Sequence, residues 1–314
     1  MQRFLSHRLT VVVVLALIVA LLPLVFPSAY YYRVAGQVFV FGLAAIGLNL
    51  LMGYAGQVSL GHAGFMGIGA YAAAIGPAQT GTPVWFWVVA GSALSGLIAW
   101  VVGRPILKLR GHYLAVATLG FGILLFMVFT NESRWTGGPD GMPVQRLELF
   151  GWRVRTGIEW YWVSGVLLVL GAWVAGNLVD SPTGRAMRAI HDSEVASRSA
   201  GIDVARQKLT AFVISAVYAS VAGASFALMN GHLTPDVSSF LRSVELVTMV
   251  VVGGMGSIFG SLVGSAVLVV LPQALTVFHD YEHAILGLMI MLFMIFLREG
   301  IVPSLARRFG RRSA

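Results

Sequence analysis

The sequence predicts an all-α protein that crosses a lipid bilayer several times. Hydrophobic residues make up 57% of the 314 residues, charged residues make up only 11%, and the mean hydropathy is +0.82. Soluble domains carry about 25% charged residues, so this composition is not that of a soluble fold. Long uncharged runs recur along the chain, and a helix satisfies its own backbone groups within lipid. The predicted class is therefore a polytopic helical membrane protein.

The apolar runs predict about ten spans, judged against a bilayer core of about 30 Å and a helical rise of about 1.5 Å per residue. These expected spans are residues 9–26, 35–52, 58–76, 84–103, 112–130, 158–178, 209–229, 243–252, 260–277 and 284–297. The first run could instead be a cleaved signal peptide, but no clear A-x-A site follows it, so we expect a retained span. The third is interrupted by glycine and the eighth is short, so either could be re-entrant or discontinuous.

The placement of lysine and arginine predicts the orientation, because cytoplasmic loops carry the excess of these residues. With the N-terminus inside, 15 of the 21 lysine and arginine residues fall in cytoplasmic segments and 6 fall in outer segments. The inverted topology reverses this ratio. We therefore expect one transmembrane domain over residues 1–314, with both termini in the cytoplasm.

Several classes of activity are disfavoured by the residues present. The chain has no cysteine, so disulfides, thiolate metal sites and thiol catalysis are not available. Its basic residues are scattered between apolar runs, so nucleic acid is not an expected partner despite the net charge of +8. His279 and His283 have the i, i+4 spacing of zinc ligands but lack a third ligand nearby, so we expect no metal. No nucleophile has a base and an orienting group at motif spacing, so we expect no enzyme.

The longest polar interruption, residues 180–208, is expected to be a docking surface in the cytoplasm. It holds five basic and four acidic residues with small apolar residues between them. Ser181 and Pro182 are typical of a helix N-cap and first helical position. Ser193 is a candidate cap for a second short helix, which Gly201 would end. Two short amphipathic helices would form a rigid knob; the alternative is a plain solvated loop. We call residues 180–208 the polar loop.

The first of two glycine-rich segments in the apolar region is GYAGQVSLGHAG, residues 53–64. Its glycines permit close backbone approach and unusual backbone angles, while Gln57, Ser59 and His62 supply polar groups. Buried polar groups in lipid must be satisfied or must face a cavity. We expect these three residues to line a transport path or gate; the alternative is that helix ends hydrogen-bond to each other.

The second glycine-rich segment is GGMGSIFGSLVG, residues 253–264. Gly256, Gly260 and Gly264 recur every four residues, and this small-xxx-small pattern lets helices pack backbone to backbone. We expect these glycines to serve helix packing rather than ligand binding.

Three further polar residues fall within expected spans and are candidates for the same path. Glu245 lies about one turn into the eighth span, where a charge is costly enough to suggest a role or a partner such as Arg242 at i−3. The alternative is a carboxylate that reaches the outer headgroups. Asn49 and Thr118 complete the set, although such residues more often make helix–helix hydrogen bonds.

The lysines bear on the source of energy. A phosphate-binding loop needs Gly-Lys followed by Ser or Thr, but Lys108 follows Leu107 and Lys208 follows Gln207. This chain is therefore not expected to bind ATP as a cofactor in that way. If transport is driven by ATP, a separate subunit hydrolyses it, and the polar loop would be the contact with that subunit.

Four segments in a fixed order carry a family resemblance. They are GLNLLMGYAGQVSLGHAGFMGIGAYAAA (residues 47–74), WTGGPDG (135–141), GRAMRAIHDSEVASRSAGIDVARQKLTAF (184–212) and VELVTMVVVGGMGSIFGSLVGSAVL (244–268). Together they resemble the M-type permease subunit of branched-chain amino acid ABC importers. The resemblance runs over most of the chain, from about residue 36 to residue 297.

This resemblance implies a type II importer fold of the vitamin B12-importer kind, embedded in lipid of the bacterial inner membrane. It implies a second homologous permease, two cytoplasmic ATPase subunits and a periplasmic or extracellular solute-binding protein as partners. It also implies that the ATPase groove receives part of the polar loop. The coupling residues that it implies are Gly184, Arg185, Ala186, Arg188, Ala189, Ile190, Glu194, Ala196 and Gly201.

The expected function is thus a permease subunit that forms half of a translocation path. The same architecture could carry urea, amides or other small solutes. A stand-alone secondary transporter or channel would need titratable groups at mid-membrane, where only His62 and Glu245 come near. A membrane scaffold without transport is the weakest alternative, because the interior glycine and polar pattern does not favour it.

Overall fold

The computed structural model describes residues 2–109, 111–149, 152–275 and 300–310, together with the single residues 287, 291 and 295. Helices dominate this part of the chain. The expected span at residues 284–297 lies almost entirely outside the described residues, and His279 and His283 lie outside them altogether.

The long helices follow the order of the expected spans. Their bounds are α1 Gln2–Leu21, α2 Ala29–Asn49, α3 His62–Thr80, α4 Val84–Ile106, α5 His112–Asn131, α7 Gly157–Asp180, α10 Val204–Asn230, α11 Phe240–Gly253 and α12 Ile258–Leu275. A π-helical turn, Leu50–Tyr54, prolongs α2. Helix α1 ends shortly before Pro23, and a 3₁₀ turn, Leu22–Leu24, follows it, as expected where a proline disfavours the α conformation of the preceding residue.

Shorter elements connect these helices. The short helices are α6 Ser133–Thr136, α8 Pro182–Asp192, α9 Glu194–Ser199 and α14 Ile301–Gly310, with 3₁₀ turns at Gly138–Asp140 and Pro235–Ser238. The strands are β1 Met142–Pro143, β2 Glu148–Leu149, β3 Trp152–Arg153 and β4 His232–Leu233. Strand β1 pairs antiparallel with β4, and β2 pairs antiparallel with β3.

Five helices in the described part of the chain are long and apolar enough, by length and composition, to cross a membrane. They are Ala29–Tyr54, Val84–Ile106, His112–Asn131, Gly157–Asp180 and Val204–Asn230. Two shorter apolar helices, Val12–Leu24 and Ile258–Gln273, accompany them. This pattern is that of a multi-pass membrane protein.

The centre of the bundle is formed by α2 and α10. In the apolar windows of these helices 83% and 67% of residues are buried, compared with 22% in α4 and in α5. Helix α10 packs along α2, α3 and α4, and α2 also packs along α7 and α12. Small residues such as Ala216, Ala219 and Ala222 of α10 are fully buried and let the helices approach closely. The exposed apolar residues of α4 and α5 are left to face lipid.

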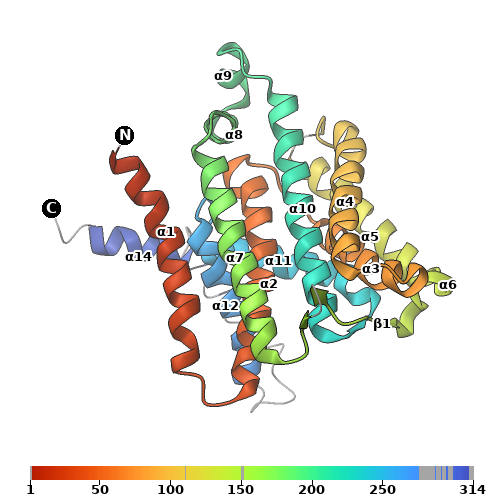
Figure 1. Ribbon diagram of the computed structural model, residues 1–314. Coiled ribbons are helices and arrows are strands. Elements are labelled where there is room, and N and C mark those ends of the chain that lie inside the picture. Colours follow the sequence, from red (N-terminus) through yellow and green to blue (C-terminus); the bar gives the residue numbers. More distant parts are fainter. Residues whose placement is uncertain are drawn as a thin grey trace.

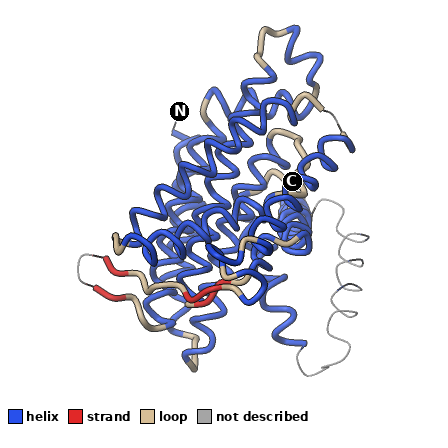
Figure 2. Tube along the Cα trace, turned by 90° about the vertical axis from the view of Figure 1, so that its right-hand side faces the viewer, coloured by secondary structure: helices blue, strands red, loops and turns tan. Residues whose placement is uncertain are grey.

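The bundle has two distinct ends (Figures 1 and 2). Helices α8 and α9 of the polar loop stand at one end, near the level of the N-terminus in Figure 1. The short strands gather at the opposite end. We call these the loop end and the strand end. At the strand end, the β1–β4 pair ties the segment after α5 to the segment after α10.

The third and eighth expected spans both border a non-helical break. Helix α3 begins only at His62, because residues 55–61 are not helical. Helix α11 has 14 residues and stops at Gly253, and a short non-helical break separates it from α12. Both discontinuities fall at the glycine-rich segments. We call residues 55–61 the first break and residues 254–257 the second break.

Candidate functional site

The second break meets the π-helical turn at the end of α2. A side chain on Gly53 would overlap the amide nitrogen of Gly256, so the two segments touch backbone to backbone. Gly256 has a φ of +75°, which suits a turn that only glycine adopts readily. The interior of the bundle therefore contains a junction of irregular backbone, an arrangement tolerated at membrane depth where protein buries it or where it lines a cavity.

Asn49 holds the second break in place. Its Nδ2 donates to the Ser257 carbonyl oxygen and the Ser261 Oγ, both at 2.8 Å, and its Oδ1 accepts from the Gly256 amide nitrogen at 2.8 Å. The side chain is fully buried. These contacts are helix–helix hydrogen bonds; a role of Asn49 in the translocation path stays a prediction.

The first break is held by α5. The Thr118 Oγ1 accepts from the Leu60 amide nitrogen at 3.1 Å and donates to the Ala115 carbonyl oxygen at 2.9 Å. The Gln57 amide nitrogen donates to the Leu51 carbonyl oxygen at 3.0 Å, and its side chain donates to the Ala55 carbonyl oxygen at the same distance. The side chains of Thr118 and Gln57 are buried. Gln57 therefore stabilises the break locally, and Thr118 anchors it to the bundle.

A buried polar cluster lies directly beyond the first break. The His62 Nε2 is 2.8 Å from the Ser215 Oγ and 3.1 Å from the Ser215 carbonyl oxygen. The Ala63 amide nitrogen donates to the Ser243 Oγ at 3.0 Å. Within the described residues, the His62 Nδ1 and the Ser59 Oγ are buried without a hydrogen-bond partner. Unpaired buried polar atoms are costly, so this cluster, drawn from α3, α10 and α11, is where the bundle interior can accept a polar group.

Glu245 lies apart from this cluster. Its Oε2 accepts from the Arg242 Nη1 at 2.6 Å, the i, i−3 partner that its spacing suggests. The Arg242 guanidinium lies 5.0 Å from the ring centroid of Phe41, a cation–π distance. The Glu245 side chain is about half exposed. Its charge is thus offset by a neighbour in its own helix.

The other two glycines of the second segment lie at a close helix contact. A Cβ atom on Gly260 would lie 2.7 Å from the Gly253 carbonyl oxygen, and one on Gly264 would overlap the Met249 carbonyl oxygen. Helices α11 and α12 therefore pack backbone against backbone at these positions.

The polar loop consists of two capped helices rather than a plain solvated loop. The Ser181 Oγ accepts from the Gly184 amide nitrogen at 3.2 Å, and the Ser193 Oγ accepts from the Ala196 amide nitrogen at 3.3 Å. Gly201, with a φ of +80°, follows the end of α9. The structure therefore confirms the two N-caps and the terminating glycine that the sequence predicts.

Helix α8 buries one face and exposes the other. Met187 and Ile190 are buried, whereas Arg185 and Arg188 are exposed and donate to carbonyl oxygens at the end of α7. The other residues that the resemblance implies for coupling differ in exposure. Buried or half-buried are Gly184, Ala186, Ala189 and Glu194; exposed are Ala196 and Gly201.

Sequence reasoning missed the residues that join these parts. A Cβ atom on Gly56 of the first break would lie 3.1 Å from the Cδ2 of His191 at the end of α8, so the polar loop contacts the break directly. It also missed Ser215 and Ser243 as partners of the His62 region. Serines inside apolar helices are the available signal, but many of the serines here bond only to their own helix.

The comparisons with known proteins cover all of these parts. A family model described as "Branched-chain amino acid transport system / permease component" matches residues 30–295. The high-affinity branched-chain amino acid transport system permease protein LivM, from Salmonella typhimurium and from Escherichia coli K12, is 33% identical over 294 residues, which cover 86% of this chain and 69% of either relative. The corresponding protein LivH of Escherichia coli K12 is 26% identical over 286 residues, which cover 83% of this chain and 91% of that protein.

No solved structure matches the chain significantly. The family match includes both breaks, the buried polar cluster and the polar loop, so the features described above lie within the region that defines the family. The chain belongs to the family of permease components of branched-chain amino acid transport systems.

Proposed function

We propose that this chain forms half of the translocation path of an ATP-driven importer for branched-chain amino acids or related small solutes. The partners are a second homologous permease, two cytoplasmic ATPase subunits and a solute-binding protein outside the membrane. The names of the relatives LivM and LivH, two permease proteins of one kind of transport system, support the pairing of two permeases. ATP is bound by the ATPase subunits and not by this chain.

The contact between α8 and the first break is the observation that carries this proposal. Helix α8 is fixed to α7 through Arg188, and His191, about one turn further along α8, lies against Gly56. The first break leads within a few residues to His62 and the buried polar cluster. A push on the exposed face of α8 therefore reaches the interior of the bundle through two contacts.

The proposed mechanism is alternating access. Closure of the ATPase dimer moves α8, and α8 moves the first break relative to Thr118 and the polar cluster. Because irregular backbone between helices can change its dihedral angles at low cost, the break is suited to act as the moving element. A cavity between the two permeases then opens to the other side. The binding protein selects the cargo, so this chain needs no tight substrate site.

The proposed setting is the bacterial inner membrane with the loop end in the cytoplasm. The excess of lysine and arginine at the ends of the apolar helices on that side supports this orientation. The N-terminus lies at the level of the polar loop in Figure 1, which agrees with a cytoplasmic N-terminus.

Two measurements on variants of this chain test the coupling role of α8: co-purification of the chain with the ATPase, and solute uptake into vesicles that contain the assembled transporter. A side chain at Gly184 would overlap the carbonyl oxygens of Leu178 and Val179, so Gly184→Leu is expected to displace α8. We expect this variant, or a bulky residue at Ala189, to insert into the membrane but to lose transport. Gly176→Leu is the matched control, because a Cβ atom there meets nothing within 4 Å. Normal uptake by Gly184→Leu would contradict the coupling role.

Uptake measured with leucine, isoleucine, valine, other amino acids and urea identifies the cargo. Transport of urea or amides alone would retain the architecture and replace the proposed substrate class.

A further inference from the structure

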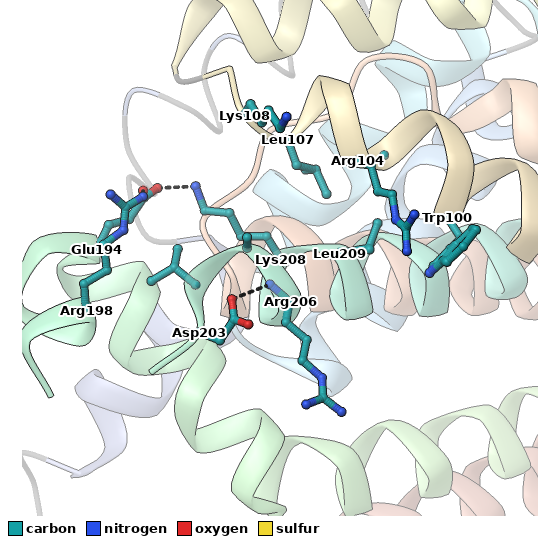
Figure 3. A pocket seen from close by; sticks show the side chains of 13 residues that line it. Trp100, Arg104, Leu107, Lys108, Glu194, Arg198, Asp203, Arg206, Lys208 and Leu209 are labelled. Atoms are coloured by element: carbon teal, nitrogen blue, oxygen red, sulfur yellow. Dashed lines mark hydrogen bonds and ion pairs between the residues drawn. The ribbon is translucent and has the colours of Figure 1, made fainter. Parts of the chain in front are cut away.

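A large pocket with several charged lining residues lies at the loop end, where α4 ends and α10 begins (Figure 3). Its volume is about 740 Å³, and α9 forms its third side. The lining residues that matter here are Trp100, Arg104, Lys108, Glu194, Arg198 and Lys208. Helices α4 and α10 are both long enough to cross the membrane, so the pocket lies at the membrane surface.

The pocket carries an excess of positive charge. Five of its lining residues are lysine or arginine and two are acidic. Both acids are already engaged: Glu194 pairs with Lys208 and lies 3.8 Å from Arg198, and the Asp203 carboxylate accepts from the Arg206 amide nitrogen at 3.0 Å. In the part of the chain that the structure describes, neither Arg104 nor Lys108 has a carboxylate partner. These two cations are available to an anion.

An aromatic side chain positions one of these cations. The Arg104 guanidinium lies 3.6 Å from the ring centroid of Trp100, and Figure 3 shows the two side chains lying together on the α4 side of the pocket. Stacking on a ring leaves the edge N–H groups of a guanidinium free to donate to a phosphate. Tryptophan and arginine are both favoured at the level of lipid headgroups.

An apolar surface next to the pocket favours a lipid phosphate over a soluble phosphate as the bound anion. Leu97 lies one turn before Trp100 on α4, and Val101 lies one turn before Arg104; both are large exposed hydrophobic residues. A lipid whose phosphate enters the pocket would lay its acyl chains along this face, whereas a soluble phosphate would gain nothing from it. Basic pockets between transmembrane helices typically bind anionic headgroups.

We propose that the pocket between α4, α9 and α10 binds the phosphate headgroup of an anionic phospholipid. The lipid would bridge Arg104 and Lys108 of the α4 end to Arg198 of α9, while the buried Lys208 stays paired with Glu194. Its binding would hold α9 against the bundle. The inference rests on the membrane-spanning helices and not on the proposed cargo or the ATPase.

Native mass spectrometry of the full chain, alone and in complex with its partner subunits, tests the proposal. The probes are phosphatidylglycerol, phosphatidylcholine with the same acyl chains, and glycerol phosphate as a soluble phosphate. The test variant is Arg104→Gln with Lys108→Gln. The matched control is Arg134→Gln with Arg146→Gln, which removes two exposed charges from the strand end. The double variant Arg104→Lys with Lys108→Arg keeps both charges, so it distinguishes loss of charge from misfolding as the cause of weaker binding.

We expect the native chain and its complex to retain phosphatidylglycerol in preference to phosphatidylcholine. The test variant should bind phosphatidylglycerol about 10- to 30-fold more weakly, as expected for two basic residues near a membrane surface. The control and the charge-conserving variant should keep most of the binding. Equal retention of both lipids, or equal weakening in the test and control variants, would overturn the proposal. Binding of glycerol phosphate as strong as that of the lipid would also overturn it, as would loss of the lipid when the ATPase binds.

Discussion

His191 of α8 lies against Gly56 of the first break, with 3.1 Å between the Cδ2 of His191 and the position of a Cβ atom on Gly56. Gly56 also has a φ of +66°, a conformation that other residues rarely adopt. The contact joins the surface offered to an ATPase and the segment that leads to the buried polar cluster. The first prediction tests this contact directly.

The first prediction concerns Gly56→Val. The new side chain would collide with His191 and push α8 away from the break, so we expect ATP-dependent uptake to fall about 5- to 150-fold, as a displacement costing about 1–3 kcal/mol would produce. Gly81→Val is the matched control. Gly81 has the same φ of +66° but meets nothing within 4 Å, so this variant introduces the backbone strain without the collision. Equal loss of uptake in both variants would show that strain, and not the His191 contact, is responsible.

The second prediction concerns Asn49→Leu. This change leaves the Gly256 amide nitrogen and the Ser257 carbonyl oxygen unpaired inside the bundle, at a cost of about 1–3 kcal/mol for each buried group. We expect a lower midpoint of thermal unfolding in detergent and faster proteolysis near the second break. Asn177→Leu, on the exposed face of α7, makes the same substitution without buried partners. If the two variants unfold alike, Asn49 does not hold the second break.

The third prediction concerns the buried polar cluster. His62→Phe removes the ring nitrogen that pairs with Ser215 and the unpaired nitrogen next to it. We expect uptake to fall by about ten- to a hundredfold, as for the loss of one or two buried hydrogen bonds, while the assembled complex still hydrolyses ATP. His62→Asn should retain part of the activity. Ser95→Ala is the control, because the buried Ser95 of α4 donates to the Ala216 carbonyl oxygen of α10 and not to His62. A His62→Phe variant that transports normally would remove this cluster from the path.

The fourth prediction concerns the ion pair of Lys208 with Glu194. Lys208 is almost fully buried, so Lys208→Met leaves the Glu194 carboxylate without its nearest cation. Hydrogen bonds to charged groups contribute about 1.5–3 kcal/mol, so we expect α9 to detach and the polar loop to be cleaved faster by protease. The charge-swapped double variant, Lys208→Glu with Glu194→Lys, should restore part of the protection. Cleavage of Lys208→Met at the rate of the unmodified chain would show that the pair does not fix α9.

The sequence predicts those features of the fold that depend on residues close together in the chain, such as helix caps. Ser181, Pro182, Ser193 and Gly201 predict the caps of α8 and α9 because each acts on residues within one turn. Glycine content marked the third expected span as discontinuous, and short length marked the eighth. Five of the expected spans correspond to helices that are clearly long and apolar in the described chain; the number of ten stays a prediction.

The contacts that build the candidate site are instead long-range. Asn49 bonds Ser257, and His62 bonds Ser215, across stretches of chain far longer than any local pattern. No periodicity indicates which serine an asparagine will meet. The same holds for the α8 contact with Gly56, which depends on where the end of α2 lies relative to the end of α7. The residue types were predictable, and their partners were not.

Uptake of leucine into vesicles with this chain alone, compared with the chain plus its companion permease, ATPase and binding protein, tests the central claim most directly. We expect accumulation only in the complete assembly and only with ATP inside the compartment that the loop end faces. Sustained accumulation by the isolated chain, driven by an ion gradient without nucleotide, would contradict the account.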